Sequence, residues 1–195
     1  DRGPMHGIPY AVKDIIDVAG MPTTCHSKLR LDHVAEADAG ITARFRNAGA
    51  IMLGKLATFE FALGGPSFDL PFPPTRNPWN LEHVPGGSSS GSAAAVAAGF
   101  VRTAIGSCTA GSIRGPAAWC GVVGLKPTYG LVSRRGVFPL AWSLDHCGPL
   151  SRSVEDAAIS LQVMAGHDPL DPSSADMPVP DFRSGLNSGV AGLRL

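Results

Sequence analysis

Apolar runs and helically spaced apolar positions alternate in the first part of the chain. Residues 8–12 form a short apolar run, which predicts a buried strand with Lys13 at its C-terminal end. Residues 38–48 carry apolar side chains at helical spacing, and Gly49 follows as a suitable helix terminator. A second apolar run at 51–53 predicts a core strand. This strand–helix–strand order is typical of a layered α/β domain.

The middle of the chain continues this alternation after a long loop. Residues 64–87 are rich in Pro, Gly and Asn and predict an irregular loop; long loops inside compact domains are often functional. An Ala-rich helix is predicted at 92–98 and a strand at 101–105. A short helix at 113–120 and a buried strand at 122–125 follow. We therefore expect an α/β fold with a mixed central sheet covered by helices on both faces.

One more helix and a loose end complete the pattern. Ser153 is a good N-cap, and Asp156 stands where a capping box needs its acidic partner. From residue 166 onward Asp, Pro and Ser dominate, which predicts a linker. We therefore divide the chain into a core at 1–165 and, at 166–195, a linker with the start of a truncated following segment.

Two loops rich in Ser and Gly carry the candidate chemistry. They span Gly86 to Ser92 and Ser107 to Pro116, and a predicted helix and strand lie between them. Such loops present backbone N–H groups and hydroxyls in a confined space, and Gly lets a backbone approach a ligand closely. Turn and helix-cap chemistry explains either loop alone equally well. The pair, together with Lys13 upstream, favours a binding or catalytic site.

Several sequence blocks resemble those of one enzyme family. Gly86 to Gly99 resembles a Gly-Gly-Ser-Ser-Gly-Gly block, and Gly106 to Pro116 resembles a Gly-Thr-Asp-Thr-Gly-Gly-Ser-Ile-Arg block. Ala11 to Asp14 resembles a lysine motif, and Gly121 to Tyr129 and Leu144 to Leu150 match two further blocks. These blocks belong to the amidase signature family of serine hydrolases, the Ser–Ser–Lys amidases. The resemblance runs over nearly the whole chain, and because family members are longer at both ends, we expect this chain to be a fragment.

The resemblance implies a covalent route to amide hydrolysis. Ser112 corresponds to the nucleophile. Ser88 corresponds to a bridging serine that follows a cis peptide bond after Gly87, and Lys13 to the base at the far end of the relay. Burial disfavours an ammonium and lowers the pKa of lysine from about 10.4, which would let Lys13 accept a proton. The expected reaction converts a small-molecule carboxylic amide into an acid and ammonia or an amine, without a cofactor.

The resemblance also implies how the oxyanion is bound. Backbone N–H groups of Thr109, Ala110 and Gly111, next to Ser112, correspond to the donors of the family's oxyanion hole. Small residues suit this role because the backbone supplies the hydrogen bonds.

Three further residues are candidates either for an acyl pocket or for ordinary core and turn positions: Phe138, Pro139 and Trp142.

Two positions depart from the family pattern. Cys108 stands where the family usually has Asp, and Ala110 stands where it often has Gly. With Cys108, Arg114 loses an anionic partner that is expected to support the loop. A small displacement of such a loop lowers the rate strongly. A catalytically impaired or inert fragment, or a pseudoenzyme subunit, is therefore the main alternative.

Other motifs fit the residues less well. Gly87 to Gly91 also matches Gly-x-Ser-x-Gly, the nucleophile elbow of α/β-hydrolases, which would make Ser89 the nucleophile of an esterase. That elbow follows a strand, whereas the segment here is polar and bounded by Pro. A P-loop fails because Ser92 stands where that motif needs Lys. The six histidines show no metal-ligand spacing, so we expect no metal site.

Composition narrows the classes of partner. Of the 195 residues, 44% are hydrophobic and 16% are charged, which is typical of a globular chain. The formal net charge is zero, which argues against nucleic acid as a partner, and no apolar run approaches the roughly 20 residues that span a membrane. The four cysteines form no paired motif, which favours free thiols and a cytoplasmic protein.

A fragment exposes apolar surface, so we expect a homo-oligomer or a companion fragment of the same protein.

Overall fold

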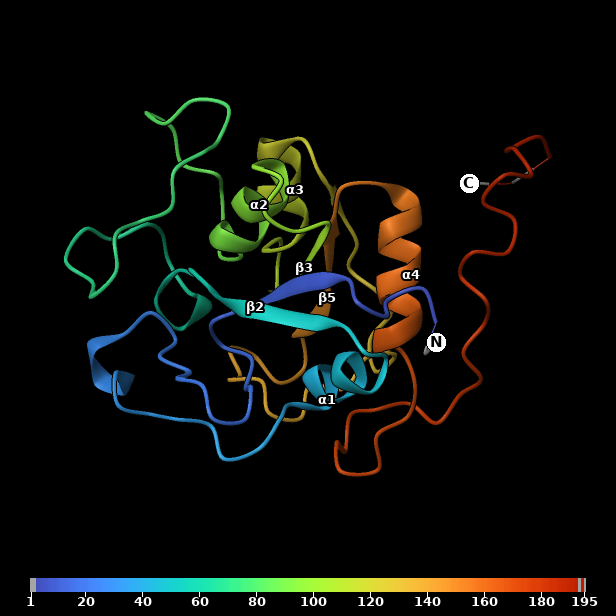
Figure 1. Ribbon diagram of the computed structural model, residues 1–195, viewed down its shortest axis with the longest axis horizontal. Coiled ribbons are helices and arrows are strands. Elements are labelled where there is room, and N and C mark those ends of the chain that lie inside the picture. The colour runs from blue at the N-terminus through green and yellow to red at the C-terminus, as the bar shows by residue number, and fades with distance from the viewer. Residues whose placement is uncertain (1–2, 193, 195) are drawn as a thin grey trace.

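A five-stranded mixed sheet forms the centre of the computed structural model, which describes residues 3–192 and 194 (Figure 1). Its strand order is β2-β1-β3-β5-β4. The strands are β1 (Pro9–Lys13), β2 (Ile51–Leu56), β3 (Thr103–Cys108), β4 (Val123–Gly124) and β5 (His146–Ser151). β1 runs parallel to β2 and β3, whereas β5 runs antiparallel to β3 and β4. The predicted mixed sheet is therefore confirmed.

Helices cover both faces of the sheet, as predicted. They are α1 (Gly40–Asn47), α2 (Ser90–Ala97), α3 (Arg114–Cys120) and α4 (Val154–Met164), with the 3₁₀ turns η1 (Lys28–Arg30) and η2 (Glu60–Ala62). Successive side chains of a strand point to opposite faces. On β1, Tyr10 stacks on Phe45 of α1. Its neighbour Ala11 packs in a separate cluster with Val96 of α2.

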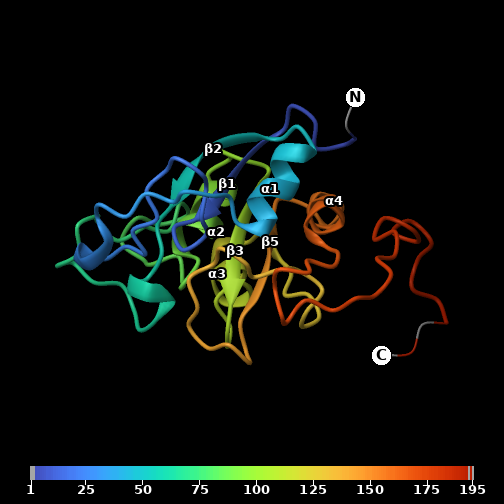
Figure 2. The same ribbon diagram turned by 90° about the horizontal axis from the view of Figure 1, so that it is seen from below.

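The views of the ribbon agree with this division. Figure 1 shows α2 and α3 together on one side of the sheet and α1 on the other. Figure 2 shows α1 and α4 next to each other, and Met164 of α4 lies in the same buried cluster as Phe45. Within the described ranges, no helix is long and apolar enough to cross a membrane.

Most predicted elements are present with shifted ends, and one was missed. α2 starts at Ser90, earlier than predicted. The predicted cap of α4 is confirmed, because the Oγ atom of Ser153 accepts from the N–H of Asp156 at 3.1 Å. β5 was not predicted, because Gly148 and Pro149 interrupt its apolar pattern. β5 forms because β3 and β4 flank it and pair with it on both edges.

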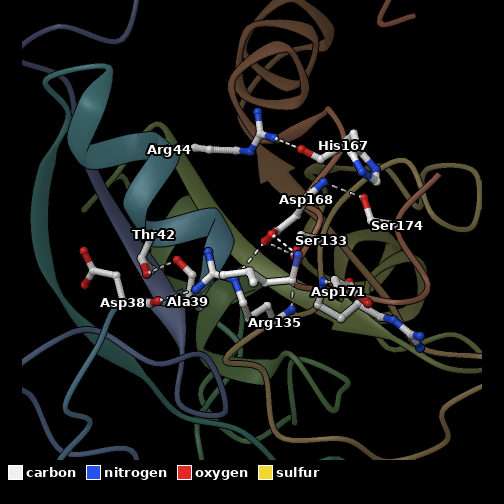
Figure 3. A network of polar contacts seen from close by, with 12 residues as sticks. Asp38, Ala39, Thr42, Arg44, Ser133, Arg135, His167, Asp168, Asp171 and Ser174 are labelled. Carbon is white, nitrogen blue, oxygen red and sulfur yellow. Dashed lines mark hydrogen bonds and ion pairs between the residues drawn. The ribbon is translucent and has the colours of Figure 1, made fainter. Parts of the chain in front are cut away.

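Polar contacts hold the start of the C-terminal segment against the core (Figure 3). The guanidinium of Arg44 donates to the carbonyl oxygen of His167 at 3.0 Å. The buried carboxylate of Asp168 accepts from the Nε atom of Arg135 at 2.9 Å. The first residues of the predicted linker at 166–195 are therefore fixed by polar contacts that a loose linker lacks. The division of the chain into a core and a following segment stays a prediction.

Candidate active site

Lys13 ends β1 and points its amine at two serine hydroxyls. The Nζ atom lies 2.6 Å from Oγ of Ser88 and 2.8 Å from Oγ of Ser107, and the exposed fraction of Lys13 is 0%. Ser107 belongs to β3, which runs parallel to β1, so the C-terminal ends of these strands lie at the same edge of the sheet. Ser88 comes from the loop that leads into α2. Two hydroxyls at this edge therefore hold the amine, and no carboxylate among the described residues is in direct contact with it.

Burial controls the charge of this amine. Loss of hydration lowers the pKa of Lys13 to about 7, from an ordinary value of 10.5. The negative charge of Asp145 acts in the opposite direction, and its effect is smaller. Near neutral pH a large share of Lys13 is therefore a neutral amine, which can accept a proton. This agrees with the lowered pKa expected from the sequence.

The backbone before Ser88 is enclosed so closely that only glycine fits. The predicted cis peptide bond between Gly87 and Ser88 is present. A Cβ atom on Gly87 would lie 2.2 Å from the ring of Phe59, and one on Gly86 would lie 2.9 Å from Cα of Pro116. The N–H of Phe59 also donates to the carbonyl oxygen of Ser88 at 3.2 Å. Phe59 packs on Gly87 and Pro116 of α3 packs on Gly86, which restrains the backbone before Ser88.

The second loop meets the first through the backbone. The N–H of Ser89 donates to the carbonyl oxygen of Ser112 at 3.3 Å, and Ser112 is partly exposed. The hydroxyl of Ser89 is fully buried and donates to the carbonyl oxygen of Ser107 at 3.1 Å. Ser89 is therefore engaged with β3 and withdrawn from solvent, which argues against its use as the nucleophile of an esterase. Lys13 and Ser88 are in direct contact, and their link to Ser112 passes through the neighbouring residue Ser89.

The residues between Cys108 and Ser112 form the turn that follows β3. Among the described residues, the backbone N–H groups of Ala110 and Gly111 donate to no other group. The hydroxyl of Thr109 donates to the Oδ1 atom of Asp145 at 2.5 Å. All three residues predicted as oxyanion donors thus lie in one turn beside Ser112.

Cys108 lies away from Arg114. Its side chain is fully buried in an apolar cluster with Ile113 and Ala117. Arg114 is exposed and its Nη2 atom donates to the carbonyl oxygen of Ala110 at 2.7 Å. Within the described part of the chain, Arg114 has no acidic partner, as expected, but it still ties the first turn of α3 to the loop.

An apolar cavity reaches the same edge of the sheet. Phe138, Pro139 and Trp142, the candidates for an acyl pocket, lie in its wall. Ser107 also lines this cavity and hydrogen bonds Lys13, so the cavity ends beside the candidate relay.

Sequence reasoning missed two residues that shape this site. Ser107 was seen as part of a loop, whereas it lies inside β3 and contacts Lys13. Phe59 was not singled out, because nothing in its local sequence indicates that it packs on Gly87. The signal that could have found Ser107 is its hydroxyl close after the predicted strand at 101–105, as Lys13 directly follows the predicted strand at 8–12.

A comparison with family models identifies the family. The model described as Amidase matches residues 1–195. The chain belongs to the amidase family. This amidase chain is 55% identical over 193 residues to a glutamyl-tRNA(Gln) amidotransferase subunit of Moorella thermoacetica, and the match covers 99% of the chain and 40% of that relative. It therefore spans about two fifths of the length of this relative.

Solved structures of the amidase family share its fold. The crystal structure of a glutamyl-tRNA(Gln) amidotransferase subunit from Thermotoga maritima matches with a TM-score of 0.91 and 48% identity, over 97% of this chain and 42% of that one. The native peptide amidase from Stenotrophomonas maltophilia matches with a TM-score of 0.83 and 46% identity, over 93% of this chain and 38% of that one. The amidase signature resemblance and the expectation of a fragment are therefore confirmed, and the family supports amide chemistry in general.

Proposed function

We propose that the full-length protein hydrolyses a carboxylic amide through an acyl-enzyme on Ser112, with Ser88 and Lys13 as the proton relay. The observation that carries this proposal is the buried amine of Lys13, which lies 2.6 Å from Oγ of Ser88 and has a pKa lowered to about 7. A buried lysine without a carboxylate in contact is suited to act as a base. The turn of Thr109, Ala110 and Gly111 supplies backbone donors beside the nucleophile.

The proposed reaction transfers the acyl group of the amide first to Ser112 and then to water. The Oγ atom of Ser112 attacks the carbonyl carbon; its proton passes to Ser88, and the proton of Ser88 passes to Lys13. The N–H groups of Ala110 and Gly111 bind the oxyanion that develops. The C–N bond then breaks, and the amine leaves with the proton that returns from Lys13 through Ser88. Water hydrolyses the remaining ester and releases the acid.

The similar proteins suggest the setting in which the full-length protein works. Because the relatives are named as subunits of an amidotransferase, we propose that the full-length protein works within a multi-subunit complex, where it acts on a small-molecule amide. The peptide amidase among the solved structures supports the second possibility of a stand-alone hydrolase. All four cysteines are buried free thiols, which favours the proposed cytoplasmic location. A homo-oligomer or a companion fragment stays a prediction, as does the absence of nucleic acid among its ligands.

A serine-directed fluorophosphonate probe tests the proposal on the full-length protein. We expect intact mass spectrometry to show one added probe, and labelling to be lost in Ser112→Ala and kept in the matched variant Ser90→Ala. Loss of labelling in Ser89→Ala, with labelling kept in Ser112→Ala, would support the esterase alternative. A folded wild-type protein that never labels would show an inert protein and overturn the proposal.

A further inference from the structure

The sheet brings Thr109 and Asp145 together at the end of a ladder. β3 and β5 pair in antiparallel register, with Cys108 opposite His146 as the last pair. The next residues on each side are Thr109 and Asp145, so the register itself sets them face to face. The hydroxyl of Thr109 donates to Oδ1 of Asp145 at 2.5 Å, across 36 residues of sequence. This contact ties the turn that precedes Ser112 to the segment before β5.

The other carboxylate oxygen holds a different segment. The Oδ2 atom of Asp145 accepts from the backbone N–H groups of Leu140 and Ala141 at 2.8 and 2.9 Å. Leu140 and Asp145 both line the apolar cavity that ends at Ser107. One partly buried carboxylate therefore joins the turn of Thr109, Ala110 and Gly111, here called the oxyanion turn, to the wall of the cavity. Hydrogen bonds to a charged acceptor are about twice as strong as neutral ones. The carboxylate can therefore hold Thr109 at a fixed distance from the backbone of Leu140 and Ala141.

We propose that Asp145 is a positioning residue that sets the oxyanion turn at Thr109 relative to the cavity wall at Leu140 and Ala141. The proposal rests on the proposed function, because the proposed function gives this turn its catalytic role. Among the described residues, the carboxylate hydrogen bonds neither the nucleophile nor the relay, so its positioning effect passes through Thr109. Donors in an oxyanion hole must meet the developing charge at hydrogen-bond distance, and a misplacement on the order of 1 Å can cost about 10²-fold in rate.

The charge of Asp145 provides an independent signature. The carboxylate of Asp145 is a negative charge near Lys13 and favours the ammonium form. The thiols of Cys25 and Cys147 have raised pKa values, so they are uncharged where Lys13 titrates. Burial of the amine outweighs the charge of Asp145 and lowers the pKa of Lys13. Removal of the Asp145 charge should therefore shift the pH midpoint of acylation downward. Removal of the Thr109 hydroxyl leaves that charge in place and should leave the midpoint where it is.

The test compares Thr109→Val with Thr109→Ser in the full-length protein. Val keeps the shape of the side chain and loses the hydroxyl, whereas Ser keeps the hydroxyl. We expect Thr109→Val to lower kcat about 10- to 100-fold with a much smaller change in KM, and Thr109→Ser to recover most of that loss. Asp145→Asn should lower kcat as well and should also move the pH midpoint of acylation to lower pH.

The outcomes separate this inference from the function on which it rests. If wild type labels at Ser112 and Thr109→Val labels at the same rate, the positioning role is wrong and the proposed function stands. Equal losses in Thr109→Val and Thr109→Ser would also overturn the role, because the hydroxyl would then be irrelevant. If folded wild type never labels, the proposed function fails and the inference fails with it. A folded state is checked by thermal unfolding of each variant.

Discussion

The amine of Lys13 and the hydroxyl of Ser88 lie 2.6 Å apart, although 75 residues separate them in sequence. The contact joins the end of a central strand to a loop in which neither glycine before the serine can carry a side chain. A hydroxyl holds the amine but brings no negative charge that would keep it protonated. The relationship therefore leaves burial in control of the pKa of Lys13.

The acylation rate should rise with pH. The reactive form of Lys13 is the neutral amine, and its pKa of about 7 places the midpoint of the rise near pH 7. The second-order rate constant of the serine probe, measured from pH 5.5 to 9 on the full-length protein, checks this. Lys13→Ala should nearly abolish acylation. A rate that stays flat from pH 6 to 9 would contradict a lysine base.

The same burial should make the free energy of unfolding depend on pH. Between about pH 7 and the ordinary lysine value of 10.5, unfolded Lys13 binds a proton that the native state does not. The native state therefore gains stability as pH rises through that window, by up to about 1.4 kcal/mol per pH unit. Urea unfolding at pH 7 and 8.5 should show a smaller increase in Lys13→Met than in wild type.

Lys28→Met is the matched control for this slope. Lys28 is exposed in η1, so its removal should leave the pH dependence of unfolding as in wild type. An equal slope in wild type and Lys13→Met would mean that the native amine keeps its proton.

Gly87→Ala should disable the site. The added Cβ atom would lie 2.2 Å from the ring of Phe59, so the backbone that carries Ser88 must shift. We expect the acylation rate to fall by about 10²-fold or more, since displacement on the order of 1 Å has that effect. Gly65→Ala is the matched control, because no atom lies within 4 Å of a Cβ atom built on that exposed glycine. Equal rates in the two variants would show that Phe59 does not restrain the loop.

Asp168→Asn should destabilise the core by about 1–3 kcal/mol, the typical effect of losing hydrogen bonds to a buried charged group. Burial by itself would raise the pKa of Asp168, but hydrogen bonds from Ser133, the N–H of Leu170 and Arg135 together lower it. Denaturant unfolding at pH 7 measures the loss. Asp176→Asn, at an exposed position, should change stability by less than about 0.5 kcal/mol.

Acid should remove the same contribution in wild type. The native pKa of Asp168 lies below its ordinary value, so the unfolded state takes up a proton first as pH falls. The stabilisation is complete above the ordinary value near pH 4 and is lost as pH falls through the native pKa. Wild type should therefore lose more stability than Asp168→Asn between pH 5 and 3, and parallel losses would contradict the lowered pKa.

Local signals in the sequence were enough for much of the fold. The apolar run before Lys13 marked β1, and Ser153 marked the start of α4, because strand periodicity and helix capping depend on residues close in sequence. β5 was missed because its Gly148 and Pro149 do not favour a strand, and its pairing with β3 and β4 overrides that preference.

The sequence by itself determined the family, the candidate residues Lys13, Ser88 and Ser112, and the mixed α/β fold, because short motifs and local periodicity carry that information. Only the tertiary structure decided which hydroxyls meet the amine, that Ser89 is turned into the core, and that Asp145 faces Thr109. These relationships depend on strand register and on burial. Both arise from contacts between residues far apart in the chain, so no local pattern records them.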